Sequence, residues 1–364
     1  MPSWCCNGGQ TFLRPALNNP AMIAPPNASL DEYVRRIRNQ HLAPLWEVLG
    51  GLVTAEPKTV IAPYHWRYRE IRPTLLESAG LITAKEAERR VLVFENPNLP
   101  GESKITNSLF GGFQLIMPGE VAPPHRHIQA ALRFIIEGNG AYTDVDGERT
   151  FMKPGDFVIT PSWTYHDHGN TTDEPMVWLD GLDMHMVRLF EASFREGWIN
   201  EDAMEPTKPE FDSINRYGAN LVPIEHSHLR KTSPIFSYPY DRTREALAAM
   251  QRAEDPSPWF GYKMRYINPL TGGDAIPTMS TFMQLLPKGF ETKPYRATDS
   301  TVFVPVEGTG TTTVGSTTFD WEPHDVIVVP SWMKYTHKAS GDAVMFSYSD
   351  RGPQELLGFW REER

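Results

Sequence analysis

Cysteine is scarce in this sequence, which has only two among its 364 residues, the neighbours Cys5 and Cys6. Adjacent cysteines rarely bridge each other, so the disulfide framework of a small secreted protein is excluded. Residues 1–13 also lack the basic start and the apolar run of a secretory signal. We therefore expect a protein of the reducing cytoplasm.

Long apolar runs and an excess of positive charge are missing as well. No stretch approaches the roughly 18 apolar residues of a membrane-spanning helix, so we expect no membrane partner. The chain has 35 Lys and Arg against 45 Asp and Glu, a formal net charge of −10. This balance offers no basic face to phosphates and argues against nucleic acid as a partner.

Proline and glycine, by contrast, are plentiful, at 32 and 27 residues. They lie in short turns between apolar runs, which is typical of a β-sandwich or β-barrel. A chain of this length predicts two domains or one duplicated fold. The clearest apolar runs cover residues 113–117, 132–137, 141–145 and 157–160.

Two segments of the chain repeat each other. Residues 154–163 (PGDFVITPSW) align with residues 323–332 (PHDVIVVPSW) without a gap, and Gln114 aligns with Gln284 at nearly the same offset. A repeat with so long a period indicates two copies of one domain.

The pattern before residue 100 is helical instead. Ser29 is a suitable N-cap, and the spacing of Tyr33, Ile37, His41 and Leu42 on one stripe predicts a helix that reaches about residue 42. The expected layout is a flexible N-terminus (1–28), a helical region (29–100), a first barrel (101–195), a linker (196–262) and a second barrel (263–364).

Three histidines stand at the spacing of a metal site. Gly119 is followed after five residues by His125 and His127, and Gly155 leads to His166. Residues two apart in a strand face the same side, so His125 and His127 can reach one ion. These spacings resemble the two motifs of the cupins, whose fold is a double-stranded β-helix, or jelly roll. The expected fold class is therefore mainly β: a bicupin with two tandem jelly-roll barrels and an N-terminal helical segment.

Two positions depart from the cupin motifs. Trp163 replaces a glycine, and Ala131 replaces the glutamate that usually completes the metal site. Three neutral imidazoles leave the ion's charge unquenched and leave coordination positions open for a bidentate anion and O2. Arg133 is expected to face the same interior, where a buried guanidinium needs an anion. The pattern predicts a small chelating aromatic carboxylate as substrate, such as an ortho-hydroxybenzoate.

Some of these residues also have a simpler interpretation. Arg133 can pair with an internal acid such as Glu137. His168 can be a packed histidine rather than a group that hydrogen-bonds the substrate or takes its proton. A second His-x-His pair, His226 and His228, lacks both the leading glycine and the partner motif.

The second repeat has lost every proposed ligand and keeps only His337, at the position of His168. Its turns and apolar strands persist, which indicates a structural barrel. We therefore predict one metal ion per chain, in the first barrel. At the positions of His125, His127, His166 and Arg133 the second repeat has Tyr295, Ala297, Tyr335 and Phe303.

Further segments carry a family resemblance: MPGEVAP at 117–123, ALRF at 131–134, DHGN at 167–170 and WLDGLD at 178–183. With the histidines, they resemble gentisate 1,2-dioxygenases, and a weaker resemblance extends over the whole chain from about Leu42. The resemblance implies an oxidoreductase of aromatic catabolism that uses Fe(II) and O2. It would open gentisate between the carboxyl- and hydroxyl-bearing carbons to give maleylpyruvate. It also implies a homotetramer.

The same resemblance implies roles for particular residues. His125, His127 and His166 would hold the iron, Arg133 would bind the substrate carboxylate, and His168 would contact the chelating oxygens. A salicylate-cleaving relative has Trp where Phe110 stands, which favours gentisate. Salicylate, substituted salicylates and 1-hydroxy-2-naphthoate stay open as substrates of the same chemistry. The further substrate-binding positions are Arg89, Phe110, Gly112 and Asp180.

Two other classes of cupin protein compete with this interpretation. A sugar isomerase or decarboxylase that uses Zn or Mn usually keeps the glutamate ligand that Ala131 has replaced, and it would act without O2. A non-catalytic binding module would hold a metal without turnover, or would carry a DNA-binding segment, and the sequence shows no pattern for one.

Overall fold

The computed structural model describes residues 29–199, 204–225 and 231–364. The chain divides into two compact units, residues 1–56 and 57–364. The predictions for residues 1–28 and for the pair His226 and His228 fall outside the described residues.

The described part of the first unit consists of α1 (Leu30–Arg38) and α2 (Leu45–Leu52). Ser29 caps α1 as predicted, and Glu32 completes a capping box with it, each bond being 3.2 Å long. The prediction that this helix reaches residue 42 was wrong. His41 has a φ of 57°, a left-handed backbone that ends the helical turn, so His41 and Leu42 lie beyond the helix.

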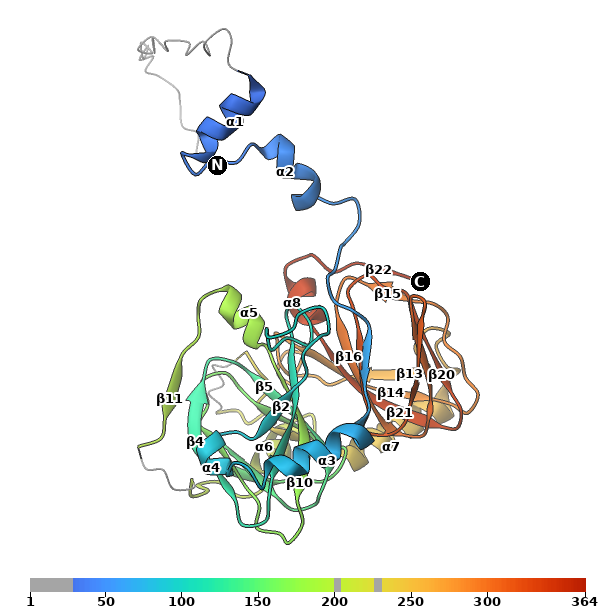
Figure 1. Cartoon of the computed structure of the whole chain (residues 1–364). Helices are drawn as coiled ribbons and strands as arrows, with labels where there is room; N and C mark the ends of the chain where they lie inside the picture. Colours follow the sequence, from blue (N-terminus) through green and yellow to red (C-terminus); the bar gives the residue numbers. More distant parts are fainter. Residues whose placement is uncertain (1–28, 200–203, 226–230) are drawn as a thin grey trace, which may run out of the picture. The chain divides into compact units, whose positions relative to one another are not determined.

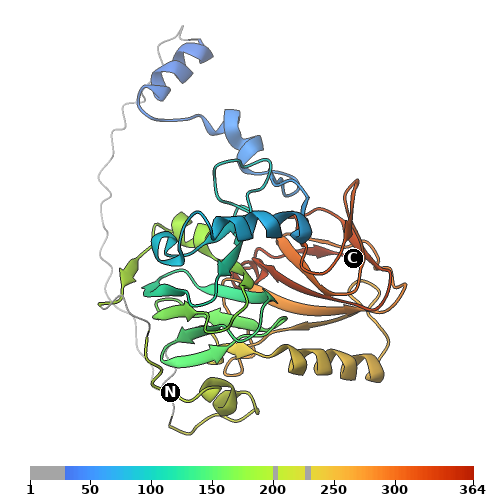
Figure 2. The same cartoon turned by 60° about the horizontal axis from the view of Figure 1, so that its bottom comes forward.

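The second unit contains two barrels that lie side by side in both views (Figures 1 and 2). The larger sheet of the first barrel has the order β12 (Ser237–Tyr238), β8 (Phe157–Thr160), β5 (Ala131–Glu137), β10 (Met176–Leu182), β3 (Phe110–Ile116) and β2 (Val91–Val93). Its smaller sheet has the order β11 (Arg195–Gly197), β4 (Val121–His127), β9 (His166–Gly169), β6 (Tyr142–Val145) and β7 (Glu148–Phe151).

The second barrel repeats this arrangement. Its larger sheet has the order β1 (Tyr64–Trp66), β19 (Val326–Val329), β16 (Thr301–Glu307), β21 (Ala343–Ser349), β14 (Ser280–Leu286) and β13 (Tyr262–Arg265). A smaller sheet has the order β18 (Thr317–Trp321), β17 (Gly310–Val314) and β20 (Tyr335–Ala339), and β15 (Arg296–Ala297) pairs with β22 (Glu362–Glu363). The duplication predicted from the sequence thus extends to the strand order, with β13 standing where β2 stands in the first barrel.

The remaining helices connect or cover these sheets. They are α3 (Tyr68–Ser78), α4 (Ala84–Ala87), α5 (Met184–Leu189), α6 (Asp212–Tyr217), α7 (Tyr240–Ala253) and α8 (Arg351–Leu356). None of the helices in the described ranges is long and apolar enough to cross a membrane.

Short strands link parts of the chain that the predicted layout keeps apart. From the predicted helical region, β1 pairs with the second barrel, where Tyr64 stands opposite Val328, and β2 borders β3 of the first. From the predicted linker, β12 pairs with the first barrel, where Ser237 stands opposite Val158. Strands of two or three residues show no periodicity in a sequence, because their pairing depends on distant partners.

The two barrels share a hydrophobic core. Strand β5 alternates: Leu132 and Phe134 belong to this core, whereas Arg133 lines a cavity in the first barrel. Phe134 stacks on Phe346 of the second barrel, with ring centroids 4.2 Å apart and an interplanar angle of 6°. Burying side chains of this size stabilises the pair by roughly 1.5–3 kcal/mol each. The alternation that buries one face of β5 therefore fixes the direction of Arg133.

Candidate metal centre and substrate cavity

Three histidines meet in the smaller sheet of the first barrel. His125 and His127 lie two residues apart on β4, and His166 begins the neighbouring strand β9, opposite His125. One potential ligand atom from each ring lies within 4.8 Å of those from the other two. Strand alternation therefore places all three imidazoles around one point, as the sequence predicts.

Backbone carbonyls hold the other nitrogen of two of these rings. Nδ1 of His127 donates to the carbonyl oxygen of Gln129 at 2.8 Å, and Nδ1 of His166 donates to that of Thr164 at 2.9 Å. A carbonyl oxygen can only accept, so both rings carry their proton on Nδ1 and offer a lone pair on Nε2. Bonds of this kind fix the tautomer and the orientation of a metal-binding histidine.

Burial keeps the three rings neutral. It lowers the pKa of His125 to about 2, that of His127 to about 4, and that of His166 well below its usual value. The positive charge of Arg89 acts in the same direction on all three pKa values. Neutral imidazole is the form that binds a metal ion, so the cluster suits a cation at neutral pH.

The donor set fits a transition metal with open coordination positions. Imidazole ligands suit iron, copper and zinc. Ala131 lines the cavity at the position of the glutamate in the cupin motif, so no carboxylate joins the three rings within the described part of the chain. The histidines line a cavity of about 420 Å³, a volume within the range of small-molecule sites.

The tryptophan that replaces the motif's glycine keeps a glycine-like backbone. Trp163 has a φ of 58°, and Trp332 has a φ of 61° at the same place in the second barrel. A guanidinium covers each indole, that of Arg126 at 4.4 Å and that of Arg296 at 4.5 Å from the ring centroid. Replacing the motif's glycine by Trp163 therefore preserves the turn before His166. The cation–π contact offsets part of the strain of the left-handed backbone at Trp163.

Two arginines bring positive charge to the cavity. Arg133 is 3% exposed, its Nη1 donates to Oγ1 of Thr160 at 2.6 Å, and its Nε has no hydrogen-bond partner among the described residues. Arg89 donates from Nη1 to the carbonyl oxygens of Glu88 and Pro123, and its buried Nη2 likewise lacks a partner in the described chain. Buried donors without acceptors are costly, so both groups point to an anionic ligand.

The simpler pairing of Arg133 with Glu137 does not occur. Glu137 accepts two hydrogen bonds from Nε of Arg72, at 2.8 and 3.0 Å. The acid beside Arg133 is Asp180 on β10, whose Oδ1 lies 3.8 Å from Nε. Burial raises the pKa of Asp180 to about 6, although Arg133 and a hydrogen bond from Trp178 oppose this rise. The internal acid that pairs with Arg133 is therefore Asp180, in an ion pair that is too long for a hydrogen bond and leaves Nε free to donate.

His168 lies next to the metal cluster rather than in the cavity lining. Its ring centroid is 5.7 Å from that of His166, its Nδ1 bonds to the hydroxyl of Thr143, and its buried Nε2 has no partner among the described residues. His337 repeats this arrangement in the second barrel, with Nδ1 2.8 Å from Oγ1 of Thr312. The Thr–His pair belongs to both barrels, and a catalytic role for His168 stays a proposal.

Phe110 and Gly112 shape an apolar wall of the cavity. Phe110 lines it from β3 and Val91 lines it from β2. A Cβ atom on Gly112 would lie 2.6 Å from Cγ1 of Val91 and 2.8 Å from the carbonyl oxygen of Leu92. Any larger residue at position 112 would push the two strands apart, so this glycine sets the space beside Val91.

Sequence reasoning missed several residues of the lining. Gln114 shares a face of β3 with Phe110, and this alternation could have revealed it. Arg188 on α5 and Arg195 on β11 belong to segments without a motif, and only the fold brings them to the cavity. They add positive charge around a cavity in a chain of net charge −10, which favours an anionic substrate.

Comparison with known proteins agrees with this geometry. A family model for the cupin domain matches residues 112–182, which include all three histidines. The chain is 56% identical over 333 residues to gentisate 1,2 dioxygenase 1 of Aquipseudomonas alcaligenes, which covers 92% of this chain and 96% of that one. The chain belongs to the gentisate 1,2-dioxygenase family.

Two further comparisons place the chain within the gentisate 1,2-dioxygenase family. A 5-aminosalicylate 1,2-dioxygenase of a Comamonas species is 38% identical over 351 residues, covering 94% of this chain and 92% of that one. The crystal structure of salicylate 1,2-dioxygenase from Pseudoaminobacter salicylatoxidans, in adducts with gentisate, matches with a TM-score of 0.87 at 32% identity. It covers 94% of this chain and 96% of that one. The family resemblance and the bicupin fold predicted from the sequence are confirmed.

Proposed function

We propose that this member of the gentisate 1,2-dioxygenase family opens gentisate between its carboxyl-bearing and hydroxyl-bearing carbons to give maleylpyruvate. The bond between these carbons breaks and both atoms of O2 enter the product, so no further reductant is consumed. One observation carries the proposal: the three-histidine cluster shares its cavity with the unsatisfied guanidinium groups of Arg133 and Arg89. A carboxylate beside a ring hydroxyl satisfies both.

The proposed cofactor is one Fe(II) per chain, held by His125, His127 and His166. An Fe(II) held there would be chelated by the carboxylate and ortho-hydroxyl of the substrate, and it would supply the redox chemistry of the reaction with O2. Support for a single ion comes from the second barrel, where Tyr295, Ala297 and Tyr335 stand at the positions of the three histidines.

Arg133 and Arg89 are proposed to hold the substrate carboxylate. Thr160 and Asp180 fix the guanidinium of Arg133 before substrate arrives, which lowers the cost of ordering it. Burial lowers the pKa of Arg89 to about 9, and the charge of Arg133 contributes to this fall. Arg89 therefore stays cationic at neutral pH, as the guanidinium of an arginine such as Arg133 does in general, and an incoming carboxylate relieves their mutual repulsion.

His168, which lies beside the metal cluster, is proposed to accept a hydrogen bond from the substrate hydroxyl through its Nε2. The hydroxyl of Thr143 donates to the carbonyl oxygen of Asp167 at 3.1 Å, so its oxygen is left to accept from Nδ1 of His168. The lone pair of His168 then resides on Nε2, which has no other partner among the described residues. Burial holds the pKa of His168 well below its usual value, so the ring is neutral.

Salicylate, substituted salicylates and 1-hydroxy-2-naphthoate are the alternative substrates. The relative named for 5-aminosalicylate favours 5-substituted salicylates among them, since these acids share the carboxylate and ortho-hydroxyl of gentisate. They differ in the part of the ring that we place against Phe110 and Val91. Contacts of this kind discriminate by only about 1–3 kcal/mol, so the preferred acid is a matter of degree.

We also propose that the protein acts as a homotetramer in the cytoplasm. Support for association comes from α2, where Leu45, Trp46, Leu49 and Leu52 are between 46% and 70% exposed. Support for the compartment comes from the sequence, whose two adjacent cysteines make no disulfide framework. Light scattering of the purified protein tests the oligomeric state, and a monomer would contradict it.

Turnover tests the proposed function. Protein loaded with Fe(II) is mixed with gentisate in aerated buffer, and O2 uptake is followed together with the absorbance of the product. We expect one O2 consumed for each gentisate opened. If gentisate is inert and salicylate, 5-aminosalicylate or 1-hydroxy-2-naphthoate is consumed, the substrate is wrong and the chemistry stands. No O2 uptake with any of these acids would contradict the proposal.

A further inference from the structure

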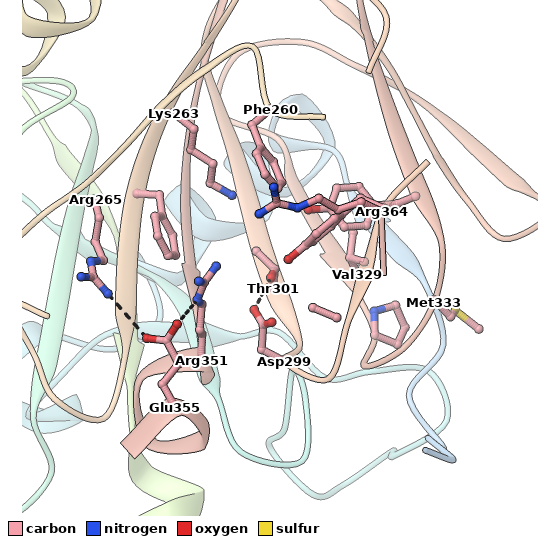
Figure 3. Close-up of a pocket in the computed structure, with 15 residues that line it drawn as sticks. Phe260, Lys263, Arg265, Asp299, Thr301, Val329, Met333, Arg351, Glu355 and Arg364 are labelled. Atoms are coloured by element: carbon pink, nitrogen blue, oxygen red, sulfur yellow. Dashed lines mark hydrogen bonds and ion pairs between the residues drawn. The ribbon is translucent and has the colours of Figure 1, made fainter. Parts of the chain in front are cut away.

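The second barrel retains a cavity at the position of the iron cavity. It has a volume of about 440 Å³, and its lining includes Tyr295, Ala297 and Tyr335, the residues that replace the three histidines. Figure 3 shows this space, into which side chains from β13, α8 and the C-terminal segment point. The second barrel has therefore lost the metal ligands of the first and retained a cavity at the same position.

Two cations have appeared where the first barrel has apolar side chains. Lys263 stands opposite Gln284 in the second barrel, as Val91 stands opposite Gln114 in the first. Both Lys263 and Val91 line the cavity of their own barrel. The second barrel thus has a lysine at the position of an apolar wall residue.

The second exchange occurs after the last long strand of each barrel. Asp183 precedes α5 and Asp350 precedes α8, so that Met184 and Arg351 open equivalent helices. Met184 lines the first cavity and Arg351 lines the second. In Figure 3 the guanidinium of Arg351 and the ammonium of Lys263 point toward each other across the space.

Lys263 has no ion pair among the described residues. Its ammonium lies over aromatic rings instead, 4.6 Å from the centroid of Phe282 and 5.6 Å from that of Phe260. Cation–π contacts stabilise the charge without neutralising it. Burial lowers the pKa of Lys263 to about 8; Asp299 opposes this fall and Arg351 adds to it. The charge is therefore held in the cavity with little compensation.

The acids of the cavity are already engaged. Glu355 accepts from Nε of Arg351 at 2.7 Å and lies 3.6 Å from Arg265. Asp299 accepts hydrogen bonds from Trp360 at 2.9 Å and from Thr301 at 3.2 Å. Three of the four lining cations have an acid partner: Arg351 pairs with Glu355, Arg265 also lies 3.8 Å from Asp274, and Arg364 pairs with Glu362 at 2.8 Å. Lys263 is thus the one lining cation without an ion pair among the described residues.

We propose that this second cavity binds a small aromatic monocarboxylate, with the carboxylate between Lys263 and Arg351 and the ring against Phe260 and Phe282. A monoanion matches the one lining cation, Lys263, that lacks an ion pair among the described residues, and a flat ring matches the aromatic lining. The inference rests on the second barrel alone and does not depend on the chemistry proposed for the first.

Crystals of the full chain soaked with 4-bromobenzoate test the location of binding. This acid lacks the ortho-hydroxyl, so it cannot chelate a metal as gentisate does, and its bromine scatters anomalously. We expect an anomalous peak in the second cavity and carboxylate density between Lys263 and Arg351. An anomalous map with no peak in the second barrel would overturn the proposal.

Calorimetric titration with benzoate tests the roles of Lys263 and Arg351 in binding. Lys263→Met and Arg351→Gln are each expected to weaken binding to the second cavity by about tenfold or more, since each removes a charged hydrogen bond. Lys288→Met is the matched control, because Lys288 is exposed and lies outside the cavity lining. Equal benzoate binding in all four proteins would contradict the assignment. So would tighter binding of succinate or inorganic phosphate than of benzoate at this cavity.

Discussion

Replacing Arg133 by methionine tests how the substrate is held. Methionine keeps most of the side-chain volume and removes the charge, so the apolar surroundings of β5 stay filled. Arg133 touches none of the three histidines through a hydrogen bond in the described structure; its partners are Thr160 and Asp180. We therefore expect the variant to bind iron with the stoichiometry of the wild type.

The size of the effect follows from what Arg133 offers the substrate. Its Nε is buried, lies 3.8 Å from Oδ1 of Asp180, and has no hydrogen-bond partner among the described residues. Losing a charged bond to a carboxylate, while Asp180 is left without its cation, costs about 2–4 kcal/mol. Transition-state theory converts this loss to a fall of roughly 30- to 900-fold in kcat/KM for gentisate.

The assay compares kcat/KM from O2 uptake for gentisate and for its amide, which keeps both hydroxyls and lacks the negative charge. Arg133→Met is expected to lose most of the wild-type preference for the acid over the amide. Arg72→Met on α3 is the control, because Arg72 lies outside the cavity and pairs with Glu137, which is on the same strand, β5, as Arg133. An unchanged preference in Arg133→Met, at full iron content, would refute the proposed role.

Further variants test the metal cluster, the wall of the cavity and a buried acid. His127→Ala is expected to lose iron, measured by metal analysis, and to lose activity with it. The control is His185→Ala, which removes a buried histidine outside the cluster and should keep both. Full iron content in His127→Ala would contradict the ligand assignment. Gly112→Ala should lower the free energy of unfolding by about 1–3 kcal/mol, because its Cβ would meet Val91 and Leu92. Gly197→Ala is the control, since the new Cβ there meets open space. Equal melting temperatures for the two variants would argue against the close approach of β2 and β3 at Gly112. Burial raises the pKa of Asp183 to about 6, so the stabilisation from its proton is complete below about pH 4 and is lost as the pH rises through about 6. Relative to Asp183→Asn, the wild type should therefore lose up to about 3 kcal/mol between pH 4 and pH 7 in urea denaturation, and parallel stability curves would show that Asp183 is not responsible.

Much of the fold was predictable because its signals are local. The apolar alternation of β5 and the glycine-led turns are visible in the sequence, and the ten-residue repeat at 154–163 indicated the duplication. The short strands β1, β2 and β12 were not predictable, since each gains its hydrogen bonds from a partner far along the chain. The helix end at Arg38 was missed because a left-handed residue such as His41 has no distinctive side chain.

The candidate site likewise contains residues that were predictable from the sequence and residues that were not. His125 and His127 share a face because they lie two apart on one strand, and the spacing to His166 matches a known motif. Arg188 and Arg195 come from segments whose sequence has no period, and only the closure of the barrel brings them near the histidines. The place of Lys263 in the second cavity was not predictable, because it depends on strand pairing. Lys263 stands opposite Gln284 as Val91 stands opposite Gln114, and this register makes Lys263 the counterpart of Val91.

The most direct test of the central proposal is the fate of the oxygen atoms. Fe(II)-loaded protein is given gentisate under ¹⁸O₂, and the ring-opened product is analysed by mass spectrometry before exchange with water removes the label. We expect both labelled atoms to appear in one molecule of maleylpyruvate. A product with a single labelled oxygen, or an unopened ring, would contradict ring cleavage by a dioxygenase.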